Sequence, residues 1–67
     1  MPSSVVASYY YKARSETLTI KYVSGLVYDY LNVPESAYEA MKAAFSKGTF
    51  VNQAIKGKYE FRKRTTD

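Results

Sequence analysis

One stretch of the sequence decides the fold: Thr17-Leu18-Thr19-Ile20-Lys21-Tyr22-Val23. Its polar and apolar residues alternate with a period of two, and its β-branched and aromatic content suits a pleated strand with one buried face. Segment 26–31 alternates in the same way, and Ser24-Gly25 separates the two runs. Because glycine supplies the positive φ of a tight primed turn, we predict that the two runs form a β-hairpin.

A third alternating run, residues 5–12, precedes this hairpin and predicts a first strand, with a polar loop at 13–16. One face of the sheet is predicted to form the wall of the core, and it carries Leu18, Ile20, Tyr22, Tyr28 and Tyr30. We expect the opposite face to be open, and it carries Thr17, Thr19, Lys21, Val23, Val27, Asp29 and Leu31.

The apolar residues change to a helical spacing after Asn32. Pro34 and Glu35 suit a first helical turn, with Ser36 as a competing start. The stripe that predicts this helix consists of Val33, Ala37, Tyr38, Met41, Ala44 and Phe45.

Gly48 is the predicted end of the first helix, where Lys47 would offset the helix dipole. Thr49 is the predicted cap of a second, shorter helix that ends at Gly57. Residues 59–61 alternate again and predict a last short strand, followed by a polar tail from Arg62.

These elements predict one α+β domain over residues 1–67, with loose ends at 1–4 and 63–67. An antiparallel sheet of three strands plus a short C-terminal strand would carry two helices packed on one face, in the order β-β-β-α-α-β. A chain of this size buries only roughly 60% of its unfolded surface, so we expect a thin core.

The composition excludes several classes of protein. The chain has 10 Lys and Arg, 6 Asp and Glu, 8 Tyr, and no Cys, His or Trp. Without Cys no disulfide can form, and without Cys or His a structural zinc site has no suitable ligands. The usual catalytic base, His, and the usual thiol nucleophile, Cys, are also missing. We therefore expect a cytoplasmic protein that is not an enzyme and has no metal, cofactor or membrane span.

The order of several motifs resembles a known family. A tyrosine-bearing first strand is followed by Ser24-Gly25, Tyr28-Asp29-Tyr30, Val33-Pro34, Tyr38, Ser46-Lys47-Gly48 and Phe50-Val51-Asn52. This order resembles the KTSC domain, named after the C-terminal extension of some lysyl-tRNA synthetases and also found in small bacterial and phage proteins. The similar core covers about residues 5–61, and Tyr28 and Tyr30 match the family's Tyr-x-Tyr signature.

The resemblance implies structural roles for Tyr28, Tyr30, Pro34, Gly48 and Asn52, the last through a side-chain bond to the backbone. The family usually has an acidic residue where this chain has Lys12, so no carboxylate role transfers to that position. The family has no established activity, and its link to RNA is by association with a synthetase.

Weak RNA or tRNA binding is the leading hypothesis from the residues. Five cations lie in the stretch 56–64, and they are Lys56, Lys58, Arg62, Lys63 and Arg64. Contact of all five with a single strand would give a salt slope of at most about −3.5, which means modest, non-specific affinity. Bases stack on exposed aromatic rings, and alternation alone leaves Tyr9, Tyr10 and Tyr11 all open as the exposed tyrosine of the first strand. Tyr10, beside Lys12 and Lys21, is the best candidate for the stacking residue. The competing interpretation is a solvated basic tail.

The alternative function is contact with an unknown protein or with a second copy of the chain. Alternation places four apolar residues on the open face of the sheet, and they are Val6, Val23, Val27 and Leu31. A patch of this kind on a small domain predicts an interface, whereas scattered surface valines need no explanation.

Overall fold

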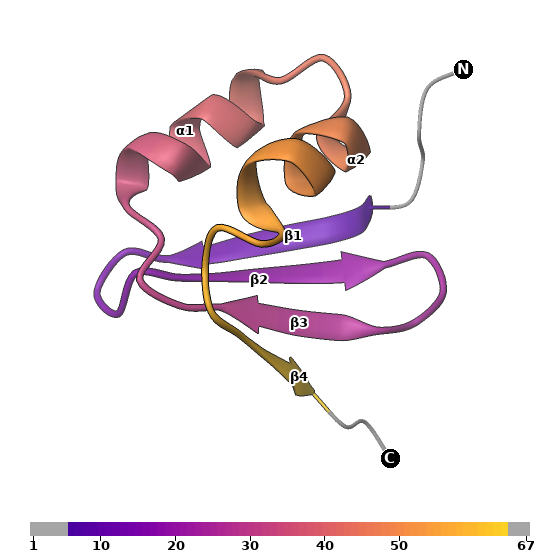
Figure 1. Ribbon diagram of the computed structural model, residues 1–67, viewed down its shortest axis with the longest axis horizontal. Helices are drawn as coiled ribbons and strands as arrows, with labels where there is room; N and C mark the ends of the chain where they lie inside the picture. The colour runs from indigo at the N-terminus through magenta and orange to yellow at the C-terminus, as the bar shows by residue number, and fades with distance from the viewer. Residues whose placement is uncertain (1–5, 65–67) are drawn as a thin grey trace.

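The structure is a computed structural model of the chain and describes residues 6–64. The elements within these residues are β1 (Val6–Lys12), β2 (Thr17–Tyr22), β3 (Val27–Tyr30), α1 (Glu35–Ala43), α2 (Lys47–Phe50), the π-helix η1 (Val51–Ile55) and β4 (Phe61–Arg64). The strands form one antiparallel sheet in the order β1-β2-β3-β4, with the helices on one side (Figure 1). The predicted α+β fold is confirmed.

The helices cover the face that the alternation predicted. Leu18 and Ile20 of β2 are fully buried, and Tyr30 of β3 is almost fully buried. The helical layer and its connections contribute the buried residues Val33, Met41, Val51 and Ile55. Full burial of an apolar side chain of this size stabilises the fold by roughly 1.5–3 kcal/mol, so this small set is the main source of stability.

A β-bulge in β1 changes which residues face the helices. Val6 lies opposite Tyr22 and Ser8 lies opposite Lys21, so two steps along β1 match one step along β2. The extra residue inverts the alternation, because side chains change face at every position. Val6 therefore packs against the core, which corrects its predicted place on the open face.

The β2–β3 hairpin forms as predicted, but its turn differs. The Gly25 N–H donates to the Tyr22 carbonyl at 2.9 Å, and the Tyr22 N–H donates to the Leu26 carbonyl at 2.8 Å. Gly25 has a φ of 98°, whereas Val23 and Ser24 have no positive φ. The loop is thus the three-residue kind that ends in a left-handed glycine, and the predicted primed turn is wrong.

Helix α1 is shorter than its apolar stripe. It begins after Pro34 and ends at Ala43, because Ala44 has extended backbone angles of φ −67° and ψ 139°. This change of direction leaves Phe45 fully exposed, with a relative accessibility of 102%. The prediction that Phe45 lies on the inner face of the helix is therefore wrong.

The second helix begins earlier than predicted. Its N-cap is Ser46, whose hydroxyl accepts a hydrogen bond from the Thr49 N–H, so Gly48 lies inside the helix and is buried. Gly48 is therefore not the end of the first helix. Lys47 still serves that end, because its Nζ donates to the carbonyls of Ala44 and Lys42 at 2.9 and 3.2 Å. Ammonium groups at helix C-termini are favourable.

The last strand lies later in the sequence than predicted. Gly57 has a φ of 79° and turns the chain out of the helical layer, as expected. Strand β4 then spans Phe61–Arg64 rather than 59–61, so the predicted polar tail at 62–64 pairs with β3 instead. Of the predicted loose ends, 1–4 and 65–67 lie outside the described residues, whereas Lys63 and Arg64 belong to the sheet.

Candidate nucleic-acid interface

The open face of the sheet gathers cations from three strands. Cross-strand neighbours share a face, so the register of the sheet assigns each position. One row across the sheet is Ser8, Lys21, Val27 and Arg64, and the next is Tyr10, Thr19, Asp29 and Arg62. Lys12 lies on the same face, opposite Thr17. Residues that are far apart in the sequence thus form one basic surface.

Tyr10 lies near the edge of this surface, on β1. Its side chain is 59% exposed, whereas Tyr9 and Tyr11 on the other face contact Tyr38 of α1. The Tyr11 and Tyr38 rings stack at 4.6 Å between centroids, and the Tyr11 hydroxyl donates to the Val33 carbonyl at 2.7 Å. Tyr10 is therefore the most exposed tyrosine of β1, and its role in stacking stays a prediction.

Asp29 organises the centre of the open face. It accepts a hydrogen bond from the Thr19 hydroxyl at 2.6 Å and another from Arg64 Nε at 2.9 Å. Partial burial works to raise the pKa of Asp29, but the bonds from Thr19 and Arg64 and the charges of Arg64 and Lys12 outweigh it and lower the pKa. The carboxylate stays ionised and fixes Arg64 across the sheet.

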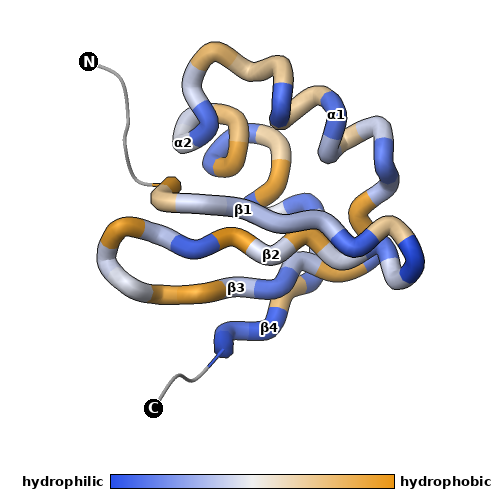
Figure 2. The backbone as a smooth tube through the Cα atoms, turned by 180° about the vertical axis from the view of Figure 1, so that it is seen from behind, coloured by the Kyte–Doolittle hydropathy of each residue, from blue (hydrophilic) through white to orange (hydrophobic). Residues whose placement is uncertain are grey.

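Three of the predicted cations do not reach this face. Lys63 alternates with its neighbours and lies opposite Tyr28 on the helix side of the sheet. Lys56 follows η1, with its Nζ 5.5 Å from the centroid of the Tyr22 ring, and Lys58 lies in the turn before β4. The cations of the stretch 56–64 therefore lie on two sides of the molecule. Figure 2 shows that β4, which carries three of them, is mostly hydrophilic along its length.

The residues predicted to form an interface are also divided. Val6 packs against the core, and Val23 lies in the hairpin loop, where it lines a pocket on the helix side. Val27 remains on the open face between Lys21 and Arg64, where it is half-buried. Leu31, also half-buried, lies just beyond the end of β3. The expected apolar patch of four side chains does not form on one face.

The residues matched to the family motif lie mostly in structural places. Tyr30 is buried with its hydroxyl 3.0 Å from that of Tyr22, and Tyr28 contacts both rings edge to face. Pro34 is the N-cap of α1, and Gly48 is buried in α2. Asn52 differs, because it is exposed on η1 and its side chain has no hydrogen-bond partner within residues 6–64.

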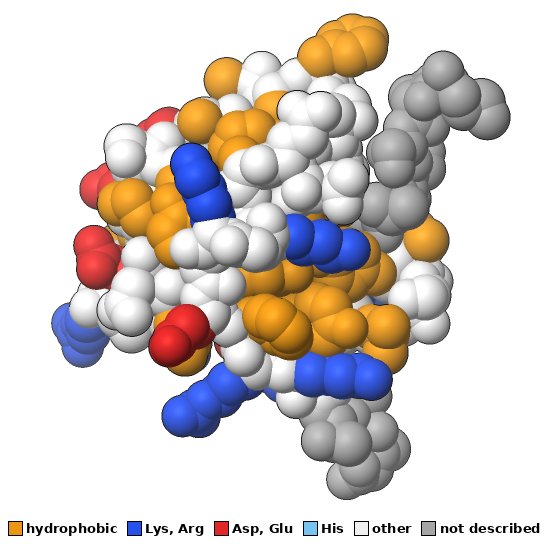
Figure 3. Space-filling model, in the orientation of Figure 1, with side chains coloured by type: hydrophobic (Ala, Val, Ile, Leu, Met, Phe, Trp, Pro, Cys, Tyr) orange, Lys and Arg blue, Asp and Glu red, His pale blue; other side chains and the backbone are white. Residues whose placement is uncertain are grey.

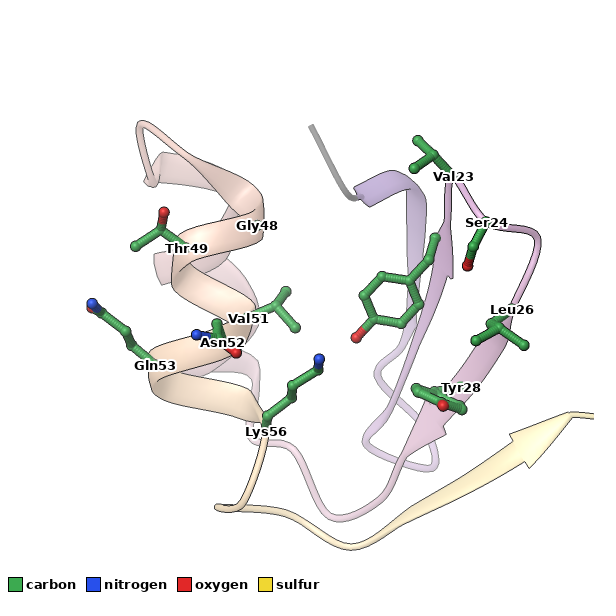
Figure 4. A pocket seen from close by; sticks show the side chains of 11 residues that line it. Val23, Ser24, Leu26, Tyr28, Gly48, Thr49, Val51, Asn52, Gln53 and Lys56 are labelled. Atoms are coloured by element: carbon green, nitrogen blue, oxygen red, sulfur yellow. The ribbon is translucent and has the colours of Figure 1, made fainter. Parts of the chain in front are cut away.

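A pocket of about 650 Å³ lies between the hairpin and the second helix (Figure 4). Its strand side is lined by Tyr22, Val23, Ser24, Leu26 and Tyr28, and its helix side by Gly48, Thr49, Val51, Asn52, Gln53 and Lys56. The sequence did not predict this pocket. Its only local signals were Leu26 beside the loop glycine and a lysine four residues after Asn52.

Two further observations concern what the described part of the chain contains. Among residues 6–64, no three acidic side chains gather in a way that could hold a metal ion. None of the helices in the same range has the length and apolar character needed to cross a membrane.

The fold and its surfaces define a small α+β domain whose four-stranded sheet has one helix-covered face and one open basic face. The sequence model of the KTSC domain family matches residues 2–59, and the chain belongs to this family. Strand β4 lies beyond the matched residues.

Relatives and a solved structure agree with this assignment. The chain is 45% identical over 58 residues to a lysine–tRNA ligase of Nostoc punctiforme, and 38% identical over 58 residues to one of Trichormus variabilis. Each match covers 87% of this chain but only 10% of the ligase. The KTSC domain protein YPO2434 from Yersinia pestis has a similar crystal structure, with a TM-score of 0.84 and 37% identity over 97% of this chain and 94% of that one.

Proposed function

We propose that the domain is a non-enzymatic module that binds single-stranded RNA weakly through the open face of its sheet. The observation that carries the proposal is that four cations and one exposed ring share this face: Lys12 and Lys21 lie near Tyr10, and Arg62 and Arg64 lie on β4 at the opposite edge of the sheet. Asp29 is the one carboxylate among the strand residues of this face, and it is already bonded to Thr19 and Arg64.

Two interactions would contribute to RNA binding at this face, the attraction of cations to phosphates and the stacking of a base on Tyr10. Lysine and arginine neutralise phosphates and release counterions, which supplies non-specific affinity. An exposed aromatic ring lets a base stack at roughly 1–3 kcal/mol without regard to sequence. A single ring and a few cations predict modest affinity with little sequence preference. The lysine–tRNA ligases that share the domain have tRNA in their name, which supports RNA as the partner by association.

The test is fluorescence anisotropy with a labelled oligouridylate and with tRNA. With three or four phosphate contacts, binding should be measurable at about 50 mM salt and should weaken with a slope of about −2 to −3. Tyr10→Ala should weaken binding roughly five- to tenfold, at the low end for stacking, whereas Tyr10→Phe should retain it. No binding of either RNA at about 50 mM salt would refute the proposal.

Matched charge variants give a sharper comparison. Lys12→Ala/Lys21→Ala removes two charges from the open face and should make the salt slope shallower by about 1.4. Lys42→Ala/Lys58→Ala removes the same charge from α1 and from the turn before β4. It should leave the slope within error of the wild type, and equal effects of the two variants would mean that the open face has no special role.

Protein contact through the same face is the second candidate, and Val27 is the observation that favours it. Its side chain is half-buried at the centre of the row that ends in Arg64. Sedimentation velocity of the wild type and Val27→Glu separates the two functions. RNA binding predicts a monomer in both cases, whereas a dimer that Val27→Glu dissociates would favour self-association.

A further inference from the structure

The pocket between the hairpin and α2–η1 joins two walls of different chemistry. The strand wall presents Tyr22, Leu26 and Tyr28, and the helix wall presents Val51, Asn52 and Lys56. In Figure 4, the Lys56 side chain extends from the end of the helix toward the strands. A volume of about 650 Å³ lies within the usual range of roughly 300–1,000 Å³ for small-molecule sites.

Lys56 gives this pocket an uncompensated positive charge. Its Nζ lies 5.5 Å from the centroid of the Tyr22 ring, and no acidic residue lines the pocket. Within residues 6–64, Lys56 forms no ion pair; the two pairs found there join Lys42 to Glu39 and Arg64 to Asp29. An ammonium group over a ring can still donate to a carboxylate or phosphate oxygen. The charge therefore favours an anionic ligand.

The strand wall favours a flat ring over an aliphatic chain. The rings of Tyr22 and Tyr28 meet edge to face with their centroids 5.5 Å apart, and the Phe61 ring extends the cluster, with its centroid 5.2 Å from that of Tyr28. A further ring added to such a cluster gains about 0.5–1.5 kcal/mol beyond the area it buries. Figure 3 shows hydrophobic side chains gathered over β2 and β3, with lysine or arginine side chains on either side of them.

The helix wall is built from an unusual turn. The Lys56 N–H donates to the Val51 carbonyl at 2.8 Å, which is the hydrogen-bond pattern of a π-helix. Turns of this kind are rare and occur frequently at functional sites. Here the turn holds the exposed amide of Asn52 and the ammonium of Lys56 on the same pocket.

We propose that this pocket binds a small aromatic anion, a flat ring that carries one carboxylate or phosphate. The ring lies against Leu26 and Tyr28, the acid group accepts from Lys56 Nζ, and the Asn52 amide bonds a polar substituent. The site lies on the helix side of the sheet, opposite the open basic face. The proposal is therefore independent of RNA binding.

The test is a titration of the ¹⁵N-labelled full chain, followed by NMR, with phenylacetate and with phenyl phosphate. Saturable shifts are expected at the backbone amides of 23–28 and 49–56. Comparison of the two probes tells a carboxylate ligand from a phosphate ligand, and AMP then asks whether a nucleotide ring fits. Three control ligands each lack one feature: benzyl alcohol has no charge, inorganic phosphate has no ring, and octanoate has an aliphatic chain in place of the ring. Each should bind at least fivefold more weakly than the better aromatic acid.

Matched variants locate the site. Lys56→Gln should weaken binding of the better probe about five- to tenfold, as loss of one exposed charge-assisted hydrogen bond predicts. Asn52→Ala should weaken it less, and Lys58→Gln, two residues away in the turn, should leave it unchanged. Lys12→Ala/Lys21→Ala should also leave it unchanged, so failure of RNA binding and failure of this pocket are distinguishable.

Three results would overturn the proposal. The first is the absence of saturable shifts at the pocket amides with both aromatic acids. The second is an equal loss of affinity in Lys56→Gln and Lys58→Gln. The third is octanoate or benzyl alcohol binding as tightly as the aromatic acids, which would identify a simple apolar groove.

Discussion

Arg64 reaches across the open face to Asp29, and its Nε donates to the carboxylate at 2.9 Å. The bond ties the last strand of the sheet to β3 on a diagonal, because the register places Arg62, two residues before Arg64, opposite Asp29. Asp29 is thereby a structural residue within the candidate RNA surface, and this double role leads to the first prediction.

Asp29→Asn should lower the free energy of unfolding at pH 7 by about 1 kcal/mol. Most of the loss should come from the Thr19 bond, because Arg64 is half exposed and its ion pair is screened by water. The same amide substitution at Glu39, whose pair with Lys42 is exposed, should change stability by less than about 0.5 kcal/mol. Urea unfolding measures both, and equal losses would contradict the assigned role.

Acid should weaken the wild type through the same group. The pKa of Asp29 is lowered in the folded state, so its contribution is present above the unfolded pKa of about 3.9 and is lost as the pH falls through the folded value. Between pH 5 and pH 2, the wild type should therefore lose more stability than Asp29→Asn. Parallel pH profiles for the two proteins would show that Asp29 does not titrate as described.

Loss of one buried tyrosine hydroxyl should be costly. The hydroxyls of Tyr22 and Tyr30 lie 3.0 Å apart in the core, so Tyr30→Phe leaves Tyr22 without this partner and should cost about 1–2 kcal/mol. Tyr22→Phe/Tyr30→Phe should cost less than the sum of the single changes. Tyr10→Phe is the exposed control. Additive losses in the double variant would mean that the hydroxyls do not interact.

Alkali gives a second readout of the same pair. Burial, and then the bond to Tyr22, raise the pKa of Tyr30 far above its usual range. Its contribution is therefore complete below the unfolded pKa of about 10 and is lost as the pH rises beyond it. The wild type should lose stability between pH 9 and pH 11.5 more steeply than Tyr30→Phe, as measured by urea unfolding. The same slope in both proteins would contradict a raised pKa.

Relief of a strained turn residue should stabilise the domain. Glu16 has a φ of 54°, which costs a residue with a Cβ about 1–2 kcal/mol, whereas glycine adopts it freely. Its carbonyl accepts from the Val33 N–H at 2.8 Å, a bond that glycine preserves. After the entropy of the unfolded chain is included, Glu16→Gly should gain about 0.5 kcal/mol.

Arg14→Gly is the matched control for Glu16→Gly. Arg14 lies in the same loop without a positive φ, so glycine there should destabilise the fold by about 0.5–1 kcal/mol. Chemical denaturation of both variants decides the comparison. A loss of stability in Glu16→Gly would mean that the backbone at this turn is not strained.

Two residues of the predicted helical stripe should respond oppositely to truncation. Met41 is fully buried, so Met41→Ala should cost about 2–5 kcal/mol, a large part of the stability of a domain this small. Phe45 is fully exposed, and Phe45→Ala should change stability by less than about 0.5 kcal/mol. Thermal unfolding of the wild type and the two variants measures both changes in stability. A large loss for Phe45→Ala would restore the longer helix that the spacing predicted.

The hydrophobic pattern of the sequence predicted the fold because the burial of apolar side chains determines both the pattern and the packing of strands and helices. The alternation of Leu18 and Ile20 identified the covered face, since a pleated strand places every second side chain on one side. The same rule failed for Val6, because a bulge inserts one residue and leaves no mark in the composition of β1. The prediction for Phe45 was wrong for a similar reason, because the helical spacing of apolar residues continues past Ala43, where the helix ends.

The candidate sites were less predictable because they depend on pairing between distant strands. The sequence identified Tyr10, Lys12 and Lys21 on one surface, but Arg62 and Arg64 join them only through the β3–β4 register. Lys56 is grouped with them by proximity in the sequence, whereas its position at the end of η1 places its Nζ over the Tyr22 ring instead. Charge counts cannot separate two sides of a sheet, and a pocket between elements has no linear signature.

The alternation of β4 links the two surfaces. Phe61 and Lys63 lie beside the tyrosines on the helix side, while Arg62 and Arg64 lie on the other side. A one-residue shift of this strand in its register against β3 would exchange the two sets. A shift of that kind would alter both surfaces at once, so neither could be remodelled by sliding the strand and leave the other intact.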